Sequence, residues 1–387
     1  MSQVREQSLI DEAISEFKKK DSNIISIFDN RMCNYCGACY LVCPVEAISY
    51  EDGNIEVSED CIFCEKCLNI CSQNQEHRYS KDFQLRERND SILKIEPKMN
   101  KIPFGEIISL YNCKSGRRDR KEFAMVGGAV TSILECAIKE GIIDGAITID
   151  FSSGRIFPSS VLITNPDDLL RVAGSRYLPT YSLYILKELH MMDNISSVAI
   201  VTLPCQAYVI DKIRKDNDTK ELIKKIKVVI TLLCGNGLPS RDEVAEFLSK
   251  QGLNLENHNF KAYREKAVSK PYLNPMNKNR YVYEENSGKK KSFASKRVFH
   301  TRGEKHCGLI CPDYTGIASD ISVGGSGLSK NIVITRSDEG EKLTKLAIDK
   351  GYLVKLSKFS KLNRIVVNFM GNRKRENIRK AYKRTFT

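Results

Sequence analysis

Two stretches near the start of the chain decide its first fold: CNYCGACYLVCP at residues 33–44 and CIFCEKCLNICS at residues 61–72. Each has three cysteines separated by two residues and a fourth cysteine after three more, and Ser72 replaces the proline of the first stretch. The chain holds 14 cysteines in 387 residues and lacks the basic start and apolar run of a signal peptide. Because thiols in a reducing compartment rarely form structural disulfides, these cysteines predict metal or redox chemistry.

Three thiolates at this spacing wrap one face of an iron-sulfur cubane, and the fourth reaches the other cluster of the pair. We expect a first cluster on Cys33, Cys36, Cys39 and Cys71. We expect a second cluster on Cys61, Cys64, Cys67 and Cys43. Zinc is a poor alternative, because zinc modules use two cysteine pairs and leave the third cysteine of each triplet without a role. The pattern resembles a bacterial-type ferredoxin with two 4Fe-4S clusters, which relays single electrons.

Composition limits what the rest of the chain can be. Hydrophobic residues make up 41% of it, enough for an ordinary core, and no apolar stretch approaches the roughly 20 residues that cross a bilayer. We expect a cytoplasmic protein, or one held at a membrane by a partner complex. The net charge of +13 suits nucleic acid, an anionic membrane or a small polyanion. No nucleic acid is expected, because the basic residues lack interleaved aromatics and a recognisable binding fold.

Patterning divides the chain into five parts. In order they are an amphipathic helix, a two-cluster ferredoxin-type domain, a charged linker, a larger domain and a basic tail ending in an exposed helix: residues 1–24, 25–75, 76–103, 104–350 and 351–387. Between the two cysteine motifs, Asp52-Gly53 predicts a hairpin turn.

The larger domain alternates apolar runs with helical patterns. Strands are predicted at residues 146–149, 197–201 and 228–233, and helices at residues 129–140, 180–190 and 240–250. The predicted fold class is therefore α/β, with an N-terminal bacterial-type two-cluster ferredoxin fold followed by a larger α/β domain.

Two short motifs in this domain are candidate phosphate sites. Gly127-Gly128 precedes a predicted helix, where backbone amides can approach a phosphate, although a glycine pair more often makes only a tight turn. The sequence Ser175-Arg176-Tyr177 offers a hydroxyl, a guanidinium and a ring, which can bind phosphate and stack or can form a plain loop.

Four further cysteines stand where ligands bind in α/β domains: Cys205, Cys234, Cys307 and Cys311. The first two follow predicted strands, and strand ends line the ligand crevice of such sheets. These thiols can converge on a third cluster, or they can be buried free thiols. We interpret Cys113, which lacks a motif, and Cys136, which is in mid-helix, as free thiols.

Five ordered motifs carry a resemblance to a known family: GGAVTSILECAIKEGIIDGAI, AGSRY, LPCQA, LLCG and CPDYTGIASDISVGGSG. From about Gly127 to Gly327 the chain resembles the family of coenzyme F420 hydrogenase/dehydrogenase beta subunits. With its ferredoxin module it resembles the deazaflavin-oxidising subunits of methanogen F420H2 dehydrogenases. The resemblance implies an FAD-binding domain with its own 4Fe-4S cluster, in which coenzyme F420 exchanges a hydride with FAD.

The resemblance also assigns residues. It implies Cys205, Cys234 and Cys311 as ligands of the third cluster. Cys307 lies one residue outside the family's C-x2-C spacing, so either it ligates through a longer loop or the cluster has a different fourth ligand. Thr202 and Ser319 also depart from the family, which has glycine and alanine at these positions.

Contacts to the organic cofactors follow from the same motifs. The expected FAD contacts are Gly127, Gly128, Ala129, Thr131, Ser175, Arg176, Tyr177 and Gln206. Arg264, with Lys266 and the basic residues of 289–297, is expected to steer the phosphate and glutamate tail of coenzyme F420.

The favoured function is that of an F420H2 dehydrogenase with FAD and three 4Fe-4S clusters. Electrons would pass to ferredoxin or to a larger redox complex of the membrane dehydrogenase, heterodisulfide reductase or hydrogenase type, or would run in reverse. One alternative is a ferredoxin-fed flavoprotein reductase of another organic substrate, and another is an electron-wiring subunit without flavin. No catalytic acid or base is assigned, because hydride transfer between stacked cofactors needs none.

Overall fold

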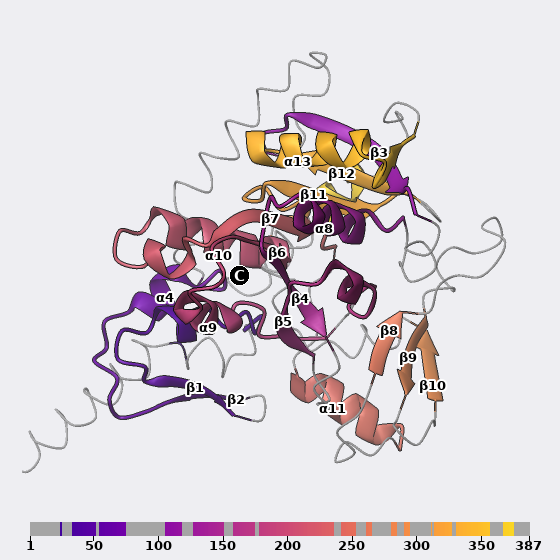
Figure 1. Cartoon of the computed structure of the whole chain (residues 1–387). Helices are drawn as coiled ribbons and strands as arrows, with labels where there is room; N and C mark the ends of the chain where they lie inside the picture. The colour runs from indigo at the N-terminus through magenta and orange to yellow at the C-terminus, as the bar shows by residue number, and fades with distance from the viewer. Residues whose placement is uncertain are drawn as a thin grey trace, which may run out of the picture.

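The computed structural model describes residues 24, 33–51, 54–74, 105–117, 127–150, 158–174, 178–235, 241–252, 261–264, 280–284, 290–294, 311, 313–326, 330–356 and 367–374. These residues form a small cysteine-rich module and a larger α/β domain (Figure 1). The predicted linker, the predicted N-terminal helix before Ile24 and the tail after Lys374 lie outside the described residues.

The cysteine-rich module consists of two short helices and a hairpin. The helices α3 (Ala38–Val42) and α4 (Lys66–Ile70) each begin inside a cysteine triplet and end at the fourth cysteine of the motif. The strands β1 (Ile48–Glu51) and β2 (Asn54–Val57) pair antiparallel, with Glu51 opposite Asn54. This register confirms the hairpin predicted from Asp52-Gly53.

The α/β domain is built on an eight-stranded mixed sheet with the order β13-β3-β12-β11-β7-β6-β4-β5. Four central strands run parallel: β4 (Gly145–Asp150), β6 (Val198–Thr202), β7 (Ile226–Leu232) and β11 (Ile321–Gly325). Four outer strands pair antiparallel: β5 (Ser159–Ile163), β12 (Asn331–Thr335), β3 (Ser109–Ser115) and β13 (Leu353–Lys355). The three predicted strands are confirmed as β4, β6 and β7.

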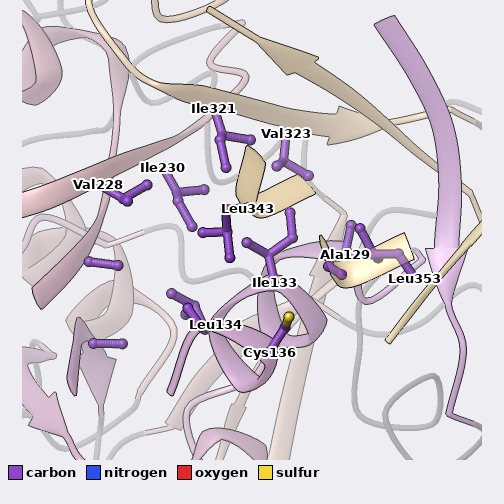
Figure 2. Packing of buried hydrophobic residues seen from close by; sticks show 14 of the residues in the cluster. Ala129, Ile133, Leu134, Cys136, Val228, Ile230, Ile321, Val323, Leu343 and Leu353 are labelled. Carbon is purple, nitrogen blue, oxygen red and sulfur yellow. The ribbon is translucent and has the colours of Figure 1, made fainter. Parts of the chain in front are cut away.

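Helices cover both faces of this sheet. One face carries α8 (Ala129–Lys139), α13 (Asp338–Asp349) and the 3-10 helix η1 (Pro166–Leu170). Figure 2 shows Ile133 and Leu134 of α8 and Leu343 of α13 packed with strand residues such as Ile230. The other face carries α9 (Ile185–Met191), α10 (Pro204–Lys215) and η2 (Lys220–Ile223).

The cysteine-rich module packs onto this second face and shares its core. Leu41 and Val42 of α3 lie in one buried cluster with Leu186 of α9 and Ile210 of α10. Figure 1 shows the indigo module beside α9 and α10, away from α8 and α13. The backbone N–H of Leu183 donates to the carbonyl of Cys36 at 2.8 Å. The two predicted domains are therefore one packed unit.

Several elements differ from the sequence-based expectation. The predicted domain end at residue 350 falls too early, because β13 pairs with β3. The helix predicted at 180–190 begins only at Ile185, after a turn. The predicted exposure of the final helix is wrong at its described end, where residues 367–374 are helical and Lys374 is buried.

The remaining elements lie beside the main sheet. A second sheet of three antiparallel strands has the order β10-β9-β8: β10 (Lys290–Ala294), β9 (Arg280–Glu284) and β8 (Lys261–Arg264). The helix α11 (Arg241–Lys250) confirms the helix predicted at 240–250. Among the described helices, none is long and apolar enough to cross a membrane.

Candidate metal centres

The two cysteine loops share one backbone conformation. In the first loop Tyr35 and Gly37 have positive φ, and in the second loop Phe63 and Glu65, at the same two positions, do too. Left-handed residues between right-handed ones turn successive backbone N–H groups toward one centre, which suits an anionic ligand. In the first loop the N–H of Tyr35 already donates to Sγ of Cys33 at 3.3 Å.

The structure brings the four cysteines predicted for the first cluster close enough to interact electrostatically. Burial raises the pKa of the Cys36 thiol, and the neighbouring Cys39, Cys71 and Cys33 raise it further. Burial likewise raises the pKa of Cys39 to about 12, although the hydroxyl of Tyr50, 2.7 Å from its Sγ, lowers it. Thiols in this state stay protonated until a cation or metal core replaces the protons.

The cysteines predicted for the second cluster range from buried to exposed. Burial raises the pKa of Cys67 to about 12, with further contributions from Cys61 and Cys64. Cys43 packs against the same core as Cys67. Cys64 is exposed, and so is its neighbour Ile62, at 59%. Cys36 of the first set therefore lies in the core shared with the α/β domain, and Cys64 of the second set lies at the surface.

Ser72, which replaces the motif's second proline, ties the two motifs together. It is 1% exposed, and its hydroxyl accepts hydrogen bonds from Nδ2 of Asn34 at 3.1 Å and from Nε2 of Gln73 at 3.2 Å. Proline has no side-chain acceptor and would leave the buried Asn34 amide without this bond.

A third set of cysteines gathers at the α/β domain. Cys205 is the second residue of α10, Cys234 follows β7, and Cys311 precedes β11. All three lie near the ammonium of Lys374, which donates to the carbonyl oxygens of Cys234 at 2.8 Å and Asp313 at 2.5 Å. Cys307, the fourth predicted ligand, lies outside the described residues.

Lys374 is a site residue that the sequence interpretation missed. Burial lowers the pKa of its ammonium, but the negative charge that Cys311, Cys234, Asp313 and Cys205 carry when deprotonated outweighs that effect and leaves the pKa raised. The available signal was the helical spacing of Val367, Gly371 and Lys374, which puts this lysine on the apolar face of its helix.

The loop after Cys311 is held by its own polar groups. The carboxylate of Asp313 accepts from the backbone amides of Thr315, Gly316 and Ile317 at 2.9, 2.7 and 2.9 Å. Gly316 has φ +75°, and a Cβ there would lie 2.3 Å from Cγ2 of Thr231. Only glycine allows this close approach to β7. The hydroxyl of Thr315 is buried without a hydrogen-bond partner among the described residues.

Thr202 and Ser319, which depart from the family pattern, both form hydrogen bonds within the fold. The hydroxyls of Thr202 and Thr231 lie 2.8 Å apart across β6 and β7. The hydroxyl of Ser319 donates to the carbonyl of Gly316 at 2.7 Å. Thr202 therefore adds a contact between the two strands that precede Cys205 and Cys234, and Ser319 adds a hydrogen bond within the loop that follows Cys311.

The glycine pair expected to contact FAD has a structural use. Gly128 has φ +74°, and a Cβ on Gly127 would lie 2.4 Å from Oδ1 of Asn331. The same oxygen accepts from the amide of Ala129 at 3.1 Å, so this amide is occupied by the protein itself. Thr131 is half-buried on α8.

The other expected cofactor contacts are dispersed or outside the described residues. Oε1 of Gln206 accepts from the amide of Leu203 at 2.7 Å, and its Nε2 donates to Ser182 at 2.9 Å, so both ends of this side chain are engaged. Ser175, Arg176 and Tyr177 lie outside the described residues. Of Arg264, on β8, only the backbone is described.

The donor sets fit iron-sulfur clusters better than single ions. Among the described residues, no group of three or more His, Cys, Asp or Glu is arranged to hold one metal ion. A cubane separates its four thiolates by an inorganic core, whereas zinc draws its ligands together at short bond lengths. Thiols that interact electrostatically without converging on one point suit the cubane.

Comparison with known proteins agrees with these motifs. Residues 110–187 and 195–359 match the models of the N- and C-terminal parts of the coenzyme F420 hydrogenase/dehydrogenase beta subunit, and residues 26–49 match a 4Fe-4S binding domain. An uncharacterised protein of Methanocaldococcus jannaschii is 30% identical over 346 residues, covering 84% of this chain and 89% of that protein.

Two further proteins are similar to this chain in sequence or in fold. One subunit of the F420H2 dehydrogenase of Methanosarcina mazei is 24% identical, over 82% of this chain and 83% of its own length. A chain of the F420-reducing [NiFe] hydrogenase complex from Methanosarcina barkeri has the same fold, with a TM-score of 0.58 at 18% identity. That similarity covers 73% of this chain and 94% of the other.

Proposed function

Because the chain belongs to the family of coenzyme F420 hydrogenase/dehydrogenase beta subunits, we propose that this F420-linked oxidoreductase acts as an F420H2 dehydrogenase. In this proposal bound FAD would exchange a hydride with coenzyme F420, and the three sets of cysteines would hold 4Fe-4S clusters that carry single electrons. The family membership and the ferredoxin motif support F420-linked electron transfer, and the FAD site and the third cluster are our extension.

The observation that carries the proposal is the sequence of three cysteine sets along one path. Helix α10 begins at the third set with Cys205, and farther along it Nζ of Lys212 donates to the carbonyl of Asn69, near Cys71. Lys212 is the seventh residue after Cys205, which is about 10 Å along the helix axis. Helix α10 therefore has Cys205 of the third set at its start and contacts the segment that carries Cys71 of the first set through Lys212.

We propose an order for the electrons on this basis. From the third set they would pass to the first set, whose Cys36 is buried against the α/β domain, and then to the second set, whose Cys64 is exposed. Cys36, Cys39 and Cys67 are buried, so clusters that they held would be shielded from water, which would favour transfer of electrons over side reactions. Bound FAD would supply the conversion between a hydride and single electrons.

The exposed side of the second set is where we propose that electrons leave or enter. Ile62 and Phe63 are exposed beside Cys64 and offer an apolar contact to a redox partner. We propose ferredoxin or a larger redox complex as that partner, in the cytoplasm or at a membrane through the complex. The support is that the similar proteins named above are subunits of a dehydrogenase and of a hydrogenase complex.

The deciding experiment is anaerobic turnover of the purified protein with F420H2 and a viologen dye, with bound flavin and iron assayed in parallel. Dye reduction together with FAD and about twelve irons is the expected result. About eight irons would remove the third cluster from the proposal. Bound FAD without any reaction toward F420H2 would contradict the F420 assignment and favour a ferredoxin-fed reductase of another substrate.

A pair of cysteine variants tests the third set directly. Cys234→Ser is expected to lose about four irons per chain, because a hydroxyl is a poor ligand for the cluster. Cys113→Ser is the matched control, since Cys113 is buried in β3 and is not part of any of the three sets. Equal iron contents in the two variants would contradict the assignment of Cys234.

A further inference from the structure

The helix at residues 367–374 delivers a lysine into the protein interior. Val367, Gly371 and Lys374 are its buried residues, at helical spacing, whereas Arg373 is exposed. Val367 packs with Ile332 and Ile334 of β12. The helix therefore docks through an apolar face, and Lys374, 2% exposed, lies at the end of that face.

An ammonium in this position needs compensation. Burial of a charged lysine is costly, and such a group either loses its proton or finds anionic partners. Two N–H donors of Lys374 go to the backbone carbonyls of Cys234 and Asp313, which are neutral acceptors. These bonds satisfy hydrogen bonding, but they leave the positive charge without a counter-charge.

The ionisable groups that act on Lys374 are the three cysteines of the third set and one carboxyl group. The carboxylate of Asp313 is already engaged by three backbone amides of its own loop. The other ionisable groups near Lys374 are Cys311, Cys234 and Cys205, which become thiolates when they bind a cluster. A 4Fe-4S cluster on these ligands carries net negative charge, which increases on reduction.

We propose that Lys374 is the charge partner of the third cluster: its ammonium offsets the charge of the thiolates, raises the cluster's reduction potential and fastens the 367–374 helix to the cluster. A fixed cation stabilises the reduced, more negative state more than the oxidised state. The inference rests on the third cluster of the proposed function and assigns a role to a residue beyond 359, where the family match ends.

The test compares wild type with Lys374→Met, Lys374→Arg and Arg373→Met by iron content and by anaerobic redox titration followed by electron paramagnetic resonance. Lys374→Met is expected to lower the midpoint potential of the third cluster alone, or to lose about four irons. Lys374→Arg keeps the charge and is expected to keep the cluster with a potential near that of wild type. Arg373→Met removes an exposed charge one residue away and is expected to change neither quantity.

Three results would overturn the inference. A third-cluster potential unchanged in Lys374→Met would exclude an electrostatic role. Equal loss of iron in Lys374→Met and Lys374→Arg would point to side-chain shape instead of charge. About eight irons in wild type would remove the third cluster, and with it both this inference and that part of the proposed function. Twelve irons in wild type, together with an unchanged third-cluster potential in Lys374→Met, would overturn this inference alone.

Discussion

The hydroxyl of Tyr50 connects the hairpin to the first set of cysteines. It lies 2.7 Å from Sγ of Cys39, and its ring centroid lies 4.2 Å from that of Tyr181 in the α/β domain. Burial raises the pKa of Tyr50, so the phenol stays protonated and can donate its hydrogen to the Cys39 sulfur once a cluster has replaced the thiol proton. Hydrogen bonds to cysteine sulfur stabilise the reduced cluster and raise its potential.

Tyr50→Phe is therefore expected to lower the midpoint potential of the first cluster without loss of iron. The measurement is a redox titration that resolves the clusters. Tyr40→Phe is the matched control, because Tyr40 stacks on Tyr184 at 4.4 Å, in the same aromatic group as Tyr50. A first-cluster potential that moves equally in both variants would argue for general packing instead of the hydrogen bond.

At the scale of elements, the two cysteine loops fold alike with different residues at the same left-handed position. The first loop has Gly37 at φ +83°, and the second has Glu65 at φ +56°. A left-handed backbone costs a residue with a Cβ about 1–2 kcal/mol, and glycine avoids this cost. The second loop is thus the more strained of the two.

Glu65→Gly is expected to raise the free energy of unfolding by about 1 kcal/mol, measured by denaturant titration of the loaded protein. Gly37→Ala is expected to lower it, because a Cβ there would also lie 3.1 Å from the amide nitrogen of Tyr184. Glu59→Gly removes an acidic side chain from an exposed turn outside the left-handed positions and serves as the control. Stabilisation in Glu59→Gly as large as in Glu65→Gly would refute the backbone explanation.

Helix α13 is joined to the sheet by one buried carboxylate. Glu341 accepts hydrogen bonds from Tyr111 at 2.7 Å, Thr335 at 2.6 Å and Ser109 at 3.0 Å, and it pairs with Lys345 at 3.1 Å. Burial raises the pKa of this carboxyl, but the bonds from Thr335, Tyr111, Lys345 and Ser109 outweigh burial, and the pKa is lowered. The ionised form is therefore the one that stabilises the fold.

Since the folded pKa of Glu341 is below the unfolded value, its contribution is present above about pH 4.3 and is lost as the pH falls through the folded pKa. Glu341→Gln is expected to lower the free energy of unfolding by about 1–3 kcal/mol near pH 7 and by less near pH 4. Unfolding free energies of both proteins at the two pH values check this. A difference independent of pH would contradict it.

At the scale of the whole molecule, the cysteine-rich module and the α/β domain share a core instead of being joined only by a linker. Leu41, Val42 and Ile70 of the module are buried with Leu183 and Leu186 of the domain. Lys66 and Lys187 form ion pairs with Asp218 and Glu46 across the same contact. This packing sets the separation between the cysteine sets, so loosening it should affect the clusters.

Leu186→Ala is expected to lower the free energy of unfolding by about 2–5 kcal/mol. It is also expected to release iron from the first set at a lower temperature, although Leu186 lies far from the ferredoxin-type motifs in the sequence. The measurement is thermal loss of the iron-sulfur absorbance beside loss of circular dichroism. Leu343→Ala makes the same change in the core on the opposite face of the sheet. If iron loss follows overall unfolding identically in both variants, the shared core has no special part in holding the clusters.

The sequence by itself determined the features that depend on local spacing. Cysteines two residues apart fix where a loop can offer thiolates, and runs of apolar residues of strand length predicted β4, β6 and β7. Ligation by the twelve named cysteines stays a prediction. The interpretation of Gly127-Gly128 as a flavin site used the same local logic, but glycine spacing alone does not distinguish a ligand from the close contact with Asn331.

Tertiary structure decided what separate segments do together. Only packing places Lys374 against cysteines that are 63 to 169 residues away in the chain, and only packing sets α10 between the first and third sets. Local patterns are set by bond geometry and helical or strand periodicity, which act over a few residues. The position of a buried charge or of a bridging helix depends on how surfaces from distant parts of the chain fit together. No local sequence pattern encodes that fit.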